Sequence, residues 1–457
     1  MYIDITAPKK SNTSTTKNPN ALGVYIETYG CQMNVADSEI VASIMSDAGY
    51  FLTEDINKSN VILLNTCSVR DNAEKKIFNR LSQLRGLKRR KHNKLVVGIL
   101  GCMAERMKGK LIGERDLVSL VVGPDEYRSI PALVSNAFDG EQGIAVKLSK
   151  VETYEDITPL RTQGISAWIS IMRGCNNFCA FCVVPYTRGR ERSRTLMSVV
   201  DEVKKLYDSG IKEVTLLGQN VNSYFDKDAS QDFPKLLTEC AKAVPNMRIR
   251  YTTSHPHDMS DGLIEAHATY ANICNYIHLP VQSGSSAVLK KMRRDYNREE
   301  YLKRIEAIRS AIPDIALSTD IISGFCTETE EDHQETLSLM REVRYDGAYM
   351  FKYSVRENTL AEKFEDDVPE EVKTRRLQEI IDQQQMISGE INLTEIGRVH
   401  EVLVEGESKK KSNEWQGRTD TNKVAIFPHN DLIKVGDIVK VKIDRSTSGT
   451  LFGQLVS

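Results

Sequence analysis

One short stretch decides the fold of this 457-residue chain, and it reads Arg173-Gly174-Cys175-Asn176-Asn177-Phe178-Cys179-Ala180-Phe181-Cys182. Its three cysteines lie within eight residues, directly after an apolar run, 167–172, that predicts a strand. Three thiolates cannot complete a tetrahedral four-ligand zinc site by themselves. They can hold three irons of a four-iron cluster and leave the fourth iron without a protein ligand. The stretch therefore predicts a [4Fe-4S] cluster on Cys175, Cys179 and Cys182. A zinc knuckle or three buried thiols are the alternatives.

The aromatic residue before the third cysteine favours the cluster. An iron without a protein ligand can chelate the amino and carboxylate groups of S-adenosylmethionine and then pass it an electron. Phe181 stands directly before Cys182, where its ring can lie against the adenine of that ligand, so we expect Phe181 to bind the cofactor. This C-x3-C-x2-C pattern, with an aromatic residue before its last cysteine, resembles the radical S-adenosylmethionine superfamily.

Three further cysteines each end an apolar run in the N-terminal part of the chain. Cys31, Cys67 and Cys102 follow stretches that predict strands, and helical patterns lie between those stretches. Alternation of strand and helix predicts parallel strands, whose carboxyl ends meet at one edge of the sheet. We therefore expect these three cysteines to converge and to hold a second, auxiliary [4Fe-4S] cluster. The alternative is that three small apolar side chains end strands by chance.

The chain beyond residue 165 repeats a longer unit of strand and helix. Six such units between residues 167 and 353 predict a partial (β/α)6 barrel, with its chemistry at the carboxyl ends of the strands. Polar residues at those ends are predicted to bind the cofactor: Gln219, Asn220, Ser254, His255, Gln282, Ser283 and Asp320. Ordinary turn chemistry is the alternative for each of them, and a histidine at a strand end is more often a structural hydrogen-bonding group.

The C-terminal part of the chain has a different pattern. A polar helix is predicted as a connector over 367–392, and short apolar stretches separated by turns predict a small antiparallel β-barrel over 393–457. Barrels of this kind bind oligonucleotides with cations that contact phosphates and rings that stack on bases. We expect RNA contacts from Lys409, Lys410, Lys411, Trp415 and Arg418. A solvated loop is the alternative.

Composition restricts the partners and the compartment. Lys and Arg number 61 against 63 Asp and Glu, so a polyanion must meet a local basic patch. The basic run within 85–94 is a second candidate for RNA contact, or a solvated helix end. No stretch approaches 18 consecutive apolar residues, and we expect 1–22 to be a disordered tail without a signal peptide. An odd count of nine cysteines favours cluster chemistry over disulfides, and we expect a cytoplasmic protein without a membrane partner.

The order of these parts resembles the methylthiotransferase family. In that family an N-terminal cluster domain, here 23–150, precedes a radical S-adenosylmethionine barrel, here 160–366, and the C-terminal barrel is a TRAM domain. Four motifs look like the MiaB branch of the family: Thr28-Tyr29-Gly30-Cys31-Gln32-Met33-Asn34, Asn65-Thr66-Cys67-Ser68-Val69-Arg70, Gly101-Cys102-Met103-Ala104-Glu105-Arg106 and Val183-Val184-Pro185-Tyr186-Thr187-Arg188-Gly189-Arg190. The chain departs from the family where Cys326-Thr327 replaces the usual Pro-Gly, and where Val355 and Glu357-Asn358 replace prolines.

The resemblance implies a reaction, cofactors and partners. It implies a radical S-adenosylmethionine tRNA methylthiotransferase that converts N6-isopentenyladenosine beside the anticodon to its 2-methylthio form. Two S-adenosylmethionine molecules and two [4Fe-4S] clusters would serve the reaction. No side chain is expected to act as a general acid or base, because the radical is generated at the cluster. The implied partners are the tRNA anticodon stem-loop, an electron donor such as flavodoxin or ferredoxin, and iron–sulfur assembly or carrier proteins, and we expect a monomer.

Two alternatives for the function stay open at this point. One is the same chemistry on threonylcarbamoyladenosine tRNA or on a ribosomal protein. The other belongs to a different class, an RNA-binding protein whose cysteines hold structural zinc.

Overall fold

The computed structural model describes residues 21–68, 71–91, 94–112, 117–161, 164–408 and 413–456, with the backbone alone for 71–73. The tail prediction for 1–20 and the predicted RNA contacts Lys409, Lys410 and Lys411 therefore lie outside the described residues. Two compact units divide the chain. The first holds the chain up to Gly164 together with Met172–Asn176 and Cys182–Arg194, and the second holds Ile165–Ile171, Asn177–Phe181 and the chain from Thr195.

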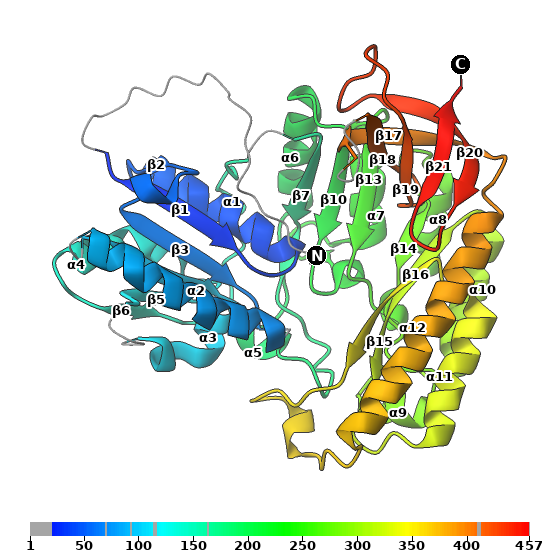
Figure 1. Ribbon diagram of the computed structural model, residues 1–457, viewed down its shortest axis with the longest axis horizontal. Coiled ribbons are helices and arrows are strands. Elements are labelled where there is room, and N and C mark those ends of the chain that lie inside the picture. The colour runs from blue at the N-terminus through cyan, green and yellow to red at the C-terminus, as the bar shows by residue number, and fades with distance from the viewer. Residues whose placement is uncertain are drawn as a thin grey trace. The chain divides into compact units, whose positions relative to one another are not determined.

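A six-stranded parallel sheet forms the centre of the first unit, with strand order β2-β1-β3-β4-β5-β6 (Figure 1). Its strands are β1 Gly23–Thr28, β2 Phe51–Leu52, β3 Val61–Thr66, β4 Val96–Gly101, β5 Leu120–Val122 and β6 Gly143–Ala145. Every residue of β3 and β4 is buried, because apolar side chains pack on both faces of these strands. That double burial explains why their sequences are continuous apolar runs without alternation.

Helices supply the apolar side chains on the two faces. They are α1 Gln32–Asp47, α2 Asp71–Arg90, α3 Cys102–Met107 and α4 Ile130–Phe138, with short 3-10 turns η1 Ile56–Lys58, η2 Lys108–Leu111 and η4 Tyr127–Ser129. Ile62 of β3 packs in one core cluster with Leu81 of α2, whereas the next residue, Leu63, packs in a second cluster with Val41 of α1. Successive strand residues point to opposite faces, so the one sheet has two cores.

A hairpin and a short helix complete the first unit. Strand β8, Met172–Arg173, pairs with β9, Arg192–Ser193, in antiparallel fashion, and α5, Val184–Arg188, lies between them in the sequence. Gly174 has φ +78°, and a Cβ there would lie 2.1 Å from the backbone oxygen of Arg190. Only glycine allows the chain to pass so close, and this glycine stands directly before Cys175.

The second unit contains the predicted partial barrel. Two parallel three-stranded sheets, β13-β10-β7 and β14-β15-β16, are joined by a bridge between Ile249 and Ile273. The strands are β7 Ser166–Ser170, β10 Glu213–Leu217, β13 Arg248–Thr252, β14 Tyr276–His278, β15 Ala316–Ser323 and β16 Gly347–Lys352. The helices between them are α6 Leu196–Asp208, α7 Phe233–Ala243, α8 Asp261–Thr269, α9 Ser286–Lys291, α10 Arg298–Ala311 and α11 Glu330–Val343. Short elements in the loops are η5 Val221–Ser223, β11 Phe225–Asp226, β12 Gln231–Asp232, η6 Pro256–Asp258 and η7 Leu360–Lys363.

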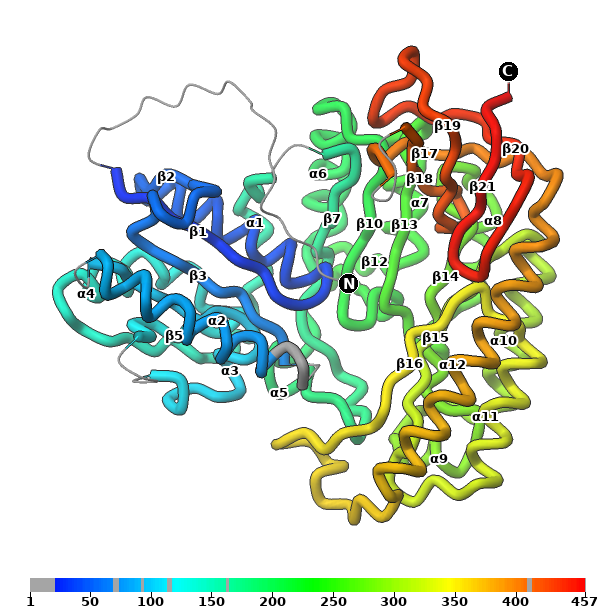
Figure 2. Tube along the Cα trace, in the orientation of Figure 1, coloured from blue at the N-terminus to red at the C-terminus, as the bar shows by residue number. Residues whose placement is uncertain are grey.

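A long helix and a closed barrel end the second unit (Figure 2). They comprise α12 Glu370–Leu393, β17 Val399–Glu407, β18 Glu414–Thr419, β19 Val424–Pro428, β20 Ile438–Ser446 and β21 Leu451–Leu455. Two arginines of β13 hold the closed barrel at the partial barrel. Arg248 donates to the carbonyl oxygens of Arg418 and Glu401, over 2.9 Å each, and Arg250 donates to the carbonyl of Thr419 over 2.8 Å. Buried arginines that satisfy these carbonyls fix one barrel on the other.

The predicted α/β fold is confirmed in its three parts, with one correction in the closed barrel. Beyond α4 the first unit also contains the edge strand β6. A strand of three residues carries too few side chains to show a period. The closed barrel is not wholly antiparallel, because β19 and β21 pair in parallel.

Candidate cluster and cofactor sites

The structure places the auxiliary cysteines at the carboxyl ends of three adjacent parallel strands. Cys31 follows β1 and precedes α1, Cys67 follows β3, and Cys102 begins α3 directly after β4. A Cβ on Gly30 would lie 2.8 Å from Cβ of Cys67, so the first two segments touch. Cys31 is exposed, whereas Cys67 and Cys102 are 5% and 4% exposed. All nine cysteines lie within the described residues, and none of them forms a disulfide there.

Amides hold these strand ends together. The side chain of Asn34 donates to the carbonyl oxygen of Thr66 over 3.1 Å, and Asn65 donates to the carbonyl of Asn34 over 2.8 Å. The Cys31 thiol donates to Oδ1 of Asn34 over 3.4 Å. Asn34, which follows Cys31 in the sequence by three residues, therefore fixes the first cysteine segment on the second.

A buried charge network adjoins Cys102. Arg188 donates from Nε to Sγ of Cys102 over 3.2 Å and from Nη2 to Oδ2 of Asp37 over 2.7 Å. Burial alone would raise the pKa of Asp37, but Arg173 and Arg188 lower it below its ordinary value. Burial also raises the pKa of the Cys102 thiol, and Arg188 opposes that rise. Metal-binding cysteines act as thiolates, so a fixed guanidinium beside Cys102 fits a cluster ligand.

The three cysteines of the decisive stretch have separate anchors in the two units. In the first unit the backbone N–H of Cys175 donates to the carbonyl oxygen of Gly189 over 3.1 Å, and Cys182 is half-buried. In the second unit Arg294 donates from Nη1 to Sγ of Cys179 over 3.3 Å. Ala180 is fixed on both sides, because its N–H donates to Met292 and its carbonyl accepts from Ala361, over 2.8 Å each.

Phe181 lies half-buried at the edge of a small core. Its ring meets that of Phe325 edge to face, with centroids 6.5 Å apart. The predicted contact with adenine requires the part of the Phe181 ring that Phe325 does not cover.

Four of the predicted cofactor residues carry buried polar atoms that lack a hydrogen-bond partner among the described residues. They are both side-chain amide atoms of Gln219, Oδ1 of Asn220, Oγ of Ser254 and both ring nitrogens of His255. Burial lowers the pKa of His255 to about 2, with smaller contributions from Arg294 and His257, so its ring is neutral. Buried polar groups in native proteins are almost always paired. These atoms therefore fit a polar ligand at the carboxyl ends of β10 and β13.

The other predicted cofactor residues have protein partners. Gln282 bridges to β15 with φ +73°, and its N–H donates to the carbonyl oxygen of Asp320 over 2.9 Å. The Ser283 hydroxyl lies 3.4 Å from Oγ1 of Thr336 and accepts from the N–H of Ser285, which gives it a structural role. Asp320 lies 3.5 Å from Nε2 of His278, and its side chain is 28% exposed, so it remains accessible to a ligand.

The C-terminal barrel corrects one expectation. Trp415 is only 7% exposed, stacks on His429 with centroids 4.6 Å apart, and belongs to the barrel core. Its ring is therefore not an exposed surface for an RNA base. Arg418 is half-buried and pairs with Glu405 over 3.1 Å, so its cation is already partly neutralised.

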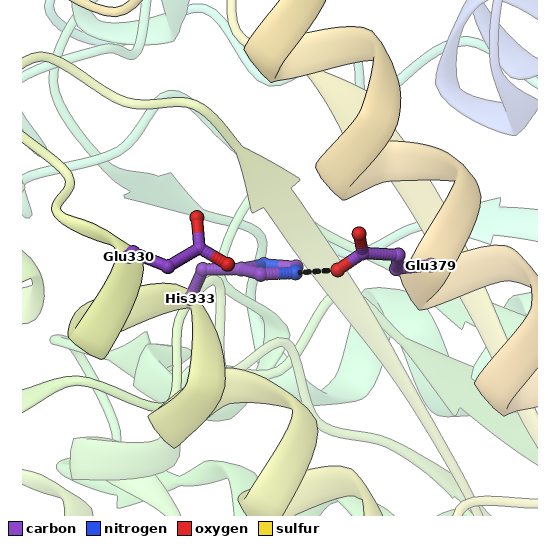
Figure 3. A group of neighbouring side chains, drawn as sticks. All are labelled: Glu330, His333 and Glu379. Atoms are coloured by element: carbon purple, nitrogen blue, oxygen red, sulfur yellow. Dashed lines mark hydrogen bonds and ion pairs between the residues drawn. The ribbon is translucent and has the colours of Figure 1, made fainter.

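Glu330, His333 and Glu379 resemble a metal site but form an ion-pair network (Figure 3). Nε2 of His333 lies 2.6 Å from Oε2 of Glu379. Arg375 donates to Glu330 and to Glu379, over 2.6 Å each, so one guanidinium already neutralises both carboxylates. The group joins α11 to α12 and carries no metal assignment.

Sequence reasoning missed the polar side chains around the cysteines. Asp37 and Arg294 have ordinary sequence surroundings, whereas Arg173 and Arg188 entered only as letters of the cysteine stretch and of a motif. The available signal was the position of Arg173 and Arg188 inside or beside cysteine-bearing loops, where a buried thiolate needs a cation.

A partial parallel barrel with a three-cysteine loop after its first strand, β7, defines an enzyme of the radical S-adenosylmethionine class. Residues 169–340 match the radical SAM superfamily, 23–123 match the uncharacterized protein family UPF0004, and 393–456 match the TRAM domain. Membership of this superfamily implies S-adenosylmethionine and an iron–sulfur cluster.

Relatives along almost the whole chain identify the family. A tRNA-2-methylthio-N(6)-dimethylallyladenosine synthase of Chloroherpeton thalassium is 56% identical over 94% of this chain and 95% of its own length. Proteins of the same name from Parabacteroides distasonis and Porphyromonas gingivalis are 57% and 53% identical, over 95% and 98% of this chain and 95% and 97% of their own lengths. The chain belongs to this family of methylthiotransferases, which confirms the predicted family and enzyme class.

Solved structures share the fold at low identity. The radical S-adenosylmethionine methyltransferase TsrM of Kitasatospora setae superposes with a TM-score of 0.53 at 14% identity, over 73% of this chain and 75% of its own. The cobalamin-dependent radical enzyme OxsB superposes with a TM-score of 0.52 at 11% identity, over 80% of this chain and 56% of its own. Within the described residues, no helix has the length and apolar character needed to cross a membrane.

Proposed function

We propose that this chain converts N6-isopentenyladenosine in the tRNA anticodon stem-loop to its 2-methylthio form. The observation that carries the proposal is the 53–57% identity, over nearly the full length, to enzymes named for this product. Neither the threonylcarbamoyl or ribosomal-protein substrates nor a zinc-stabilised RNA-binding protein is favoured by these relatives.

The two sets of cysteines have different roles in this proposal. Cys175, Cys179 and Cys182 would hold a cluster that, when bound, supplies the electron for reductive cleavage of S-adenosylmethionine and so for radical chemistry at C2 of the adenine. Cys31, Cys67 and Cys102 would hold an auxiliary cluster that supplies the sulfur chemistry of the methylthio group. A guanidinium donates to one thiol of each set, Arg294 to Cys179 and Arg188 to Cys102, which supports two separate cluster sites.

The chain's own residues bind and orient the cofactor. The buried unpaired atoms of Gln219, Asn220, Ser254 and His255 provide donors and acceptors for its polar groups, and Asp320 provides an accessible carboxylate. Phe181 provides an apolar face for the adenine. A neutral His255 ring offers one donor and one acceptor nitrogen, so it binds without acting as an acid.

The partners and domain roles follow from the same reaction. The barrel over 393–457 and Lys409, Lys410 and Lys411 bind the RNA, while 23–150 carries the auxiliary cluster and 160–366 the radical chemistry. A one-electron donor such as flavodoxin or ferredoxin reduces the cluster in the cytoplasm. Iron–sulfur assembly or carrier proteins load both sites of a monomeric enzyme.

Competition among three anticodon stem-loops tests the substrate. A prenyl group gains about 2–3 kcal/mol when a pocket removes it from water, whereas a buried carboxylate without a cation loses free energy. Mass analysis should show 2-methylthio product on the prenylated loop, roughly a hundredfold less on the unmodified loop, and none on the threonylcarbamoyl loop. Equal turnover of the prenylated and threonylcarbamoyl loops would overturn the assignment of substrate.

A further inference from the structure

One buried carboxylate in the first unit, that of Asp37, accepts hydrogen bonds from two arginines. Oδ1 of Asp37 accepts from Nη1 of Arg173 over 2.9 Å, and Oδ2 accepts from Nη2 of Arg188 over 2.7 Å. Asp37 is 0% exposed, Arg173 1% and Arg188 3%. The hydroxyl of Tyr127 donates to the same Oδ2 over 3.2 Å, so the carboxylate has little freedom to turn.

Arg188 is the member of this group that touches a cysteine. Its Nε donates to Sγ of Cys102 over 3.2 Å, while Asp37 holds Nη2. The third nitrogen, Nη1, is buried and has no hydrogen-bond partner among the described residues. An arginine stays charged, and a buried donor left unpaired costs about 1–3 kcal/mol.

Arg192 shows what a purely structural arginine looks like in the same unit. It is 6% exposed, donates from Nη2 to Asp125 over 2.8 Å, and satisfies Nε and Nη1 on backbone carbonyls. Arg188 differs in donating to sulfur and in having one buried nitrogen for which none of the described residues supplies an acceptor. A structural ion pair with Asp37 alone explains neither feature.

We propose that Arg188 is a positioning residue for the sulfur anions of the auxiliary site. Nε holds the thiolate of Cys102, and Nη1 receives a non-protein sulfur, of the class of inorganic sulfide. Asp37 fixes the orientation of the guanidinium. The inference rests on the proposed function, because it requires an auxiliary cluster on Cys31, Cys67 and Cys102.

The midpoint potential of the auxiliary cluster tests this role. The full chain with Cys175, Cys179 and Cys182 changed to Ala would be reconstituted with iron and sulfide under anaerobic conditions, so that any cluster is the auxiliary one. Arg188→Gln, Arg188→Lys and Arg192→Gln would be made in this parent. Iron content and potential, followed by electron paramagnetic resonance during titration, are read for each.

Hydrogen bonds and net charge at the sulfurs set the potential of such clusters. Arg188→Gln removes a cation and a donor, so its potential should become more negative than that of the parent. Arg188→Lys keeps the charge but loses the planar fork, so its shift should be smaller. Arg192→Gln should match the parent. If Arg188→Gln loads no cluster, a more negative midpoint potential in Arg188→Lys than in the parent supports the role of Arg188 instead.

Two results would overturn the inference and leave the proposed function standing. One is the same midpoint potential in the parent and in both Arg188 variants. The other is a potential shift, or a loss of iron, in Arg192→Gln as large as that in Arg188→Gln. Failure of both Arg188 variants to load, while Arg192→Gln loads fully, supports the proposed contact with sulfur. A folded parent that binds no cluster overturns the two-cluster function together with the inference, and this outcome is distinct from the others.

Discussion

Arg294 joins Cys179 to the end of the fourth barrel strand: its Nη1 donates to Sγ of Cys179 over 3.3 Å, and its Nη2 donates to the carbonyl oxygen of Pro280 over 3.0 Å. The phenol of Tyr296 accepts from Nε over 2.9 Å. Each nitrogen of this buried guanidinium therefore donates a hydrogen bond, and one of the acceptors is a predicted cluster ligand.

The first prediction concerns this contact. Arg294→Gln removes a donor and a cation from the thiolate, so the cluster becomes harder to reduce. Cleavage of S-adenosylmethionine should slow about tenfold at fixed reductant potential, which corresponds to about 1.4 kcal/mol in the barrier. Production of 5′-deoxyadenosine under single-turnover conditions measures the change. Arg293→Gln, at the exposed neighbour, is the matched control. Equal rates in the two variants would remove any role of Arg294 at the sulfur.

The second prediction separates the two cysteine sets. Changing Cys175, Cys179 and Cys182 to Ala should leave roughly half the iron and abolish 5′-deoxyadenosine, since only the auxiliary cluster remains. Changing Cys31, Cys67 and Cys102 to Ala should also leave roughly half the iron, with 5′-deoxyadenosine formed but no thiomethylated RNA. Iron analysis and chromatography read both. A folded triple variant without any iron would contradict two independent sites.

The third prediction comes from a departure from the family pattern. Thr327 has φ +65°, a left-handed conformation that is unfavourable for a β-branched residue, and it stands where the family usually has glycine. Thr327→Gly should raise the free energy of unfolding by about 1 kcal/mol, as measured with urea. Asn358→Gly at φ +69° is the control, because asparagine tolerates this region and the change should be only a few tenths of a kcal/mol. A loss of stability in Thr327→Gly would show that its contacts outweigh the strain.

The fourth prediction is a dependence of stability on pH. Burial lowers the pKa of His267 to about 4, and its Nδ1 lies 3.1 Å from the Tyr251 hydroxyl. The unfolded chain takes up a proton near pH 6.5 and the folded chain does not, so stability is full above pH 6.5 and falls as the pH falls toward 4.

Protonation linked to His267 should therefore lower the free energy of unfolding by roughly 2 kcal/mol between pH 7.5 and pH 5. Urea unfolding at pH 7.5 and pH 5 should show that the free energy of unfolding of His267→Gln falls by correspondingly less than that of the unaltered protein. Thr269→Ala, an exposed change in the same helix, should behave as the unaltered protein does. An identical pH dependence in His267→Gln would contradict the assignment.

The fifth prediction concerns the lysine run 409–411. Changing Lys409, Lys410 and Lys411 to Ala should reduce the slope of log affinity against log salt by about 0.7 per lost phosphate contact on a single-stranded loop. Binding of the stem-loop at several salt concentrations measures the slope. Lys434, Lys440 and Lys442, changed to Ala, form a matched set elsewhere in the same barrel. An unchanged slope for 409–411 would reduce the run to a solvated loop.

The sequence alone determined the architecture and the cysteine sets. Continuous apolar runs separated by helical periods specify parallel strands, and the first barrel strand, β7, lies within two residues of the run 167–172 that predicted it. The strand positions could be predicted because each depends on residues close together in the chain. Cys31, Cys67 and Cys102 are distant in the sequence, and their convergence was predicted from the parallel strand order. The spacing of Cys175, Cys179 and Cys182 is likewise local.

Only the tertiary structure decided which polar groups meet. Asp37 receives Arg173 from 136 residues away and Arg188 from 151 residues away, and no local pattern marks that pairing. Trp415 was expected at the surface, yet the closed barrel buries its ring. Burial and long-range hydrogen bonds depend on how distant segments pack, so they belong to the folded chain and not to its periodicities.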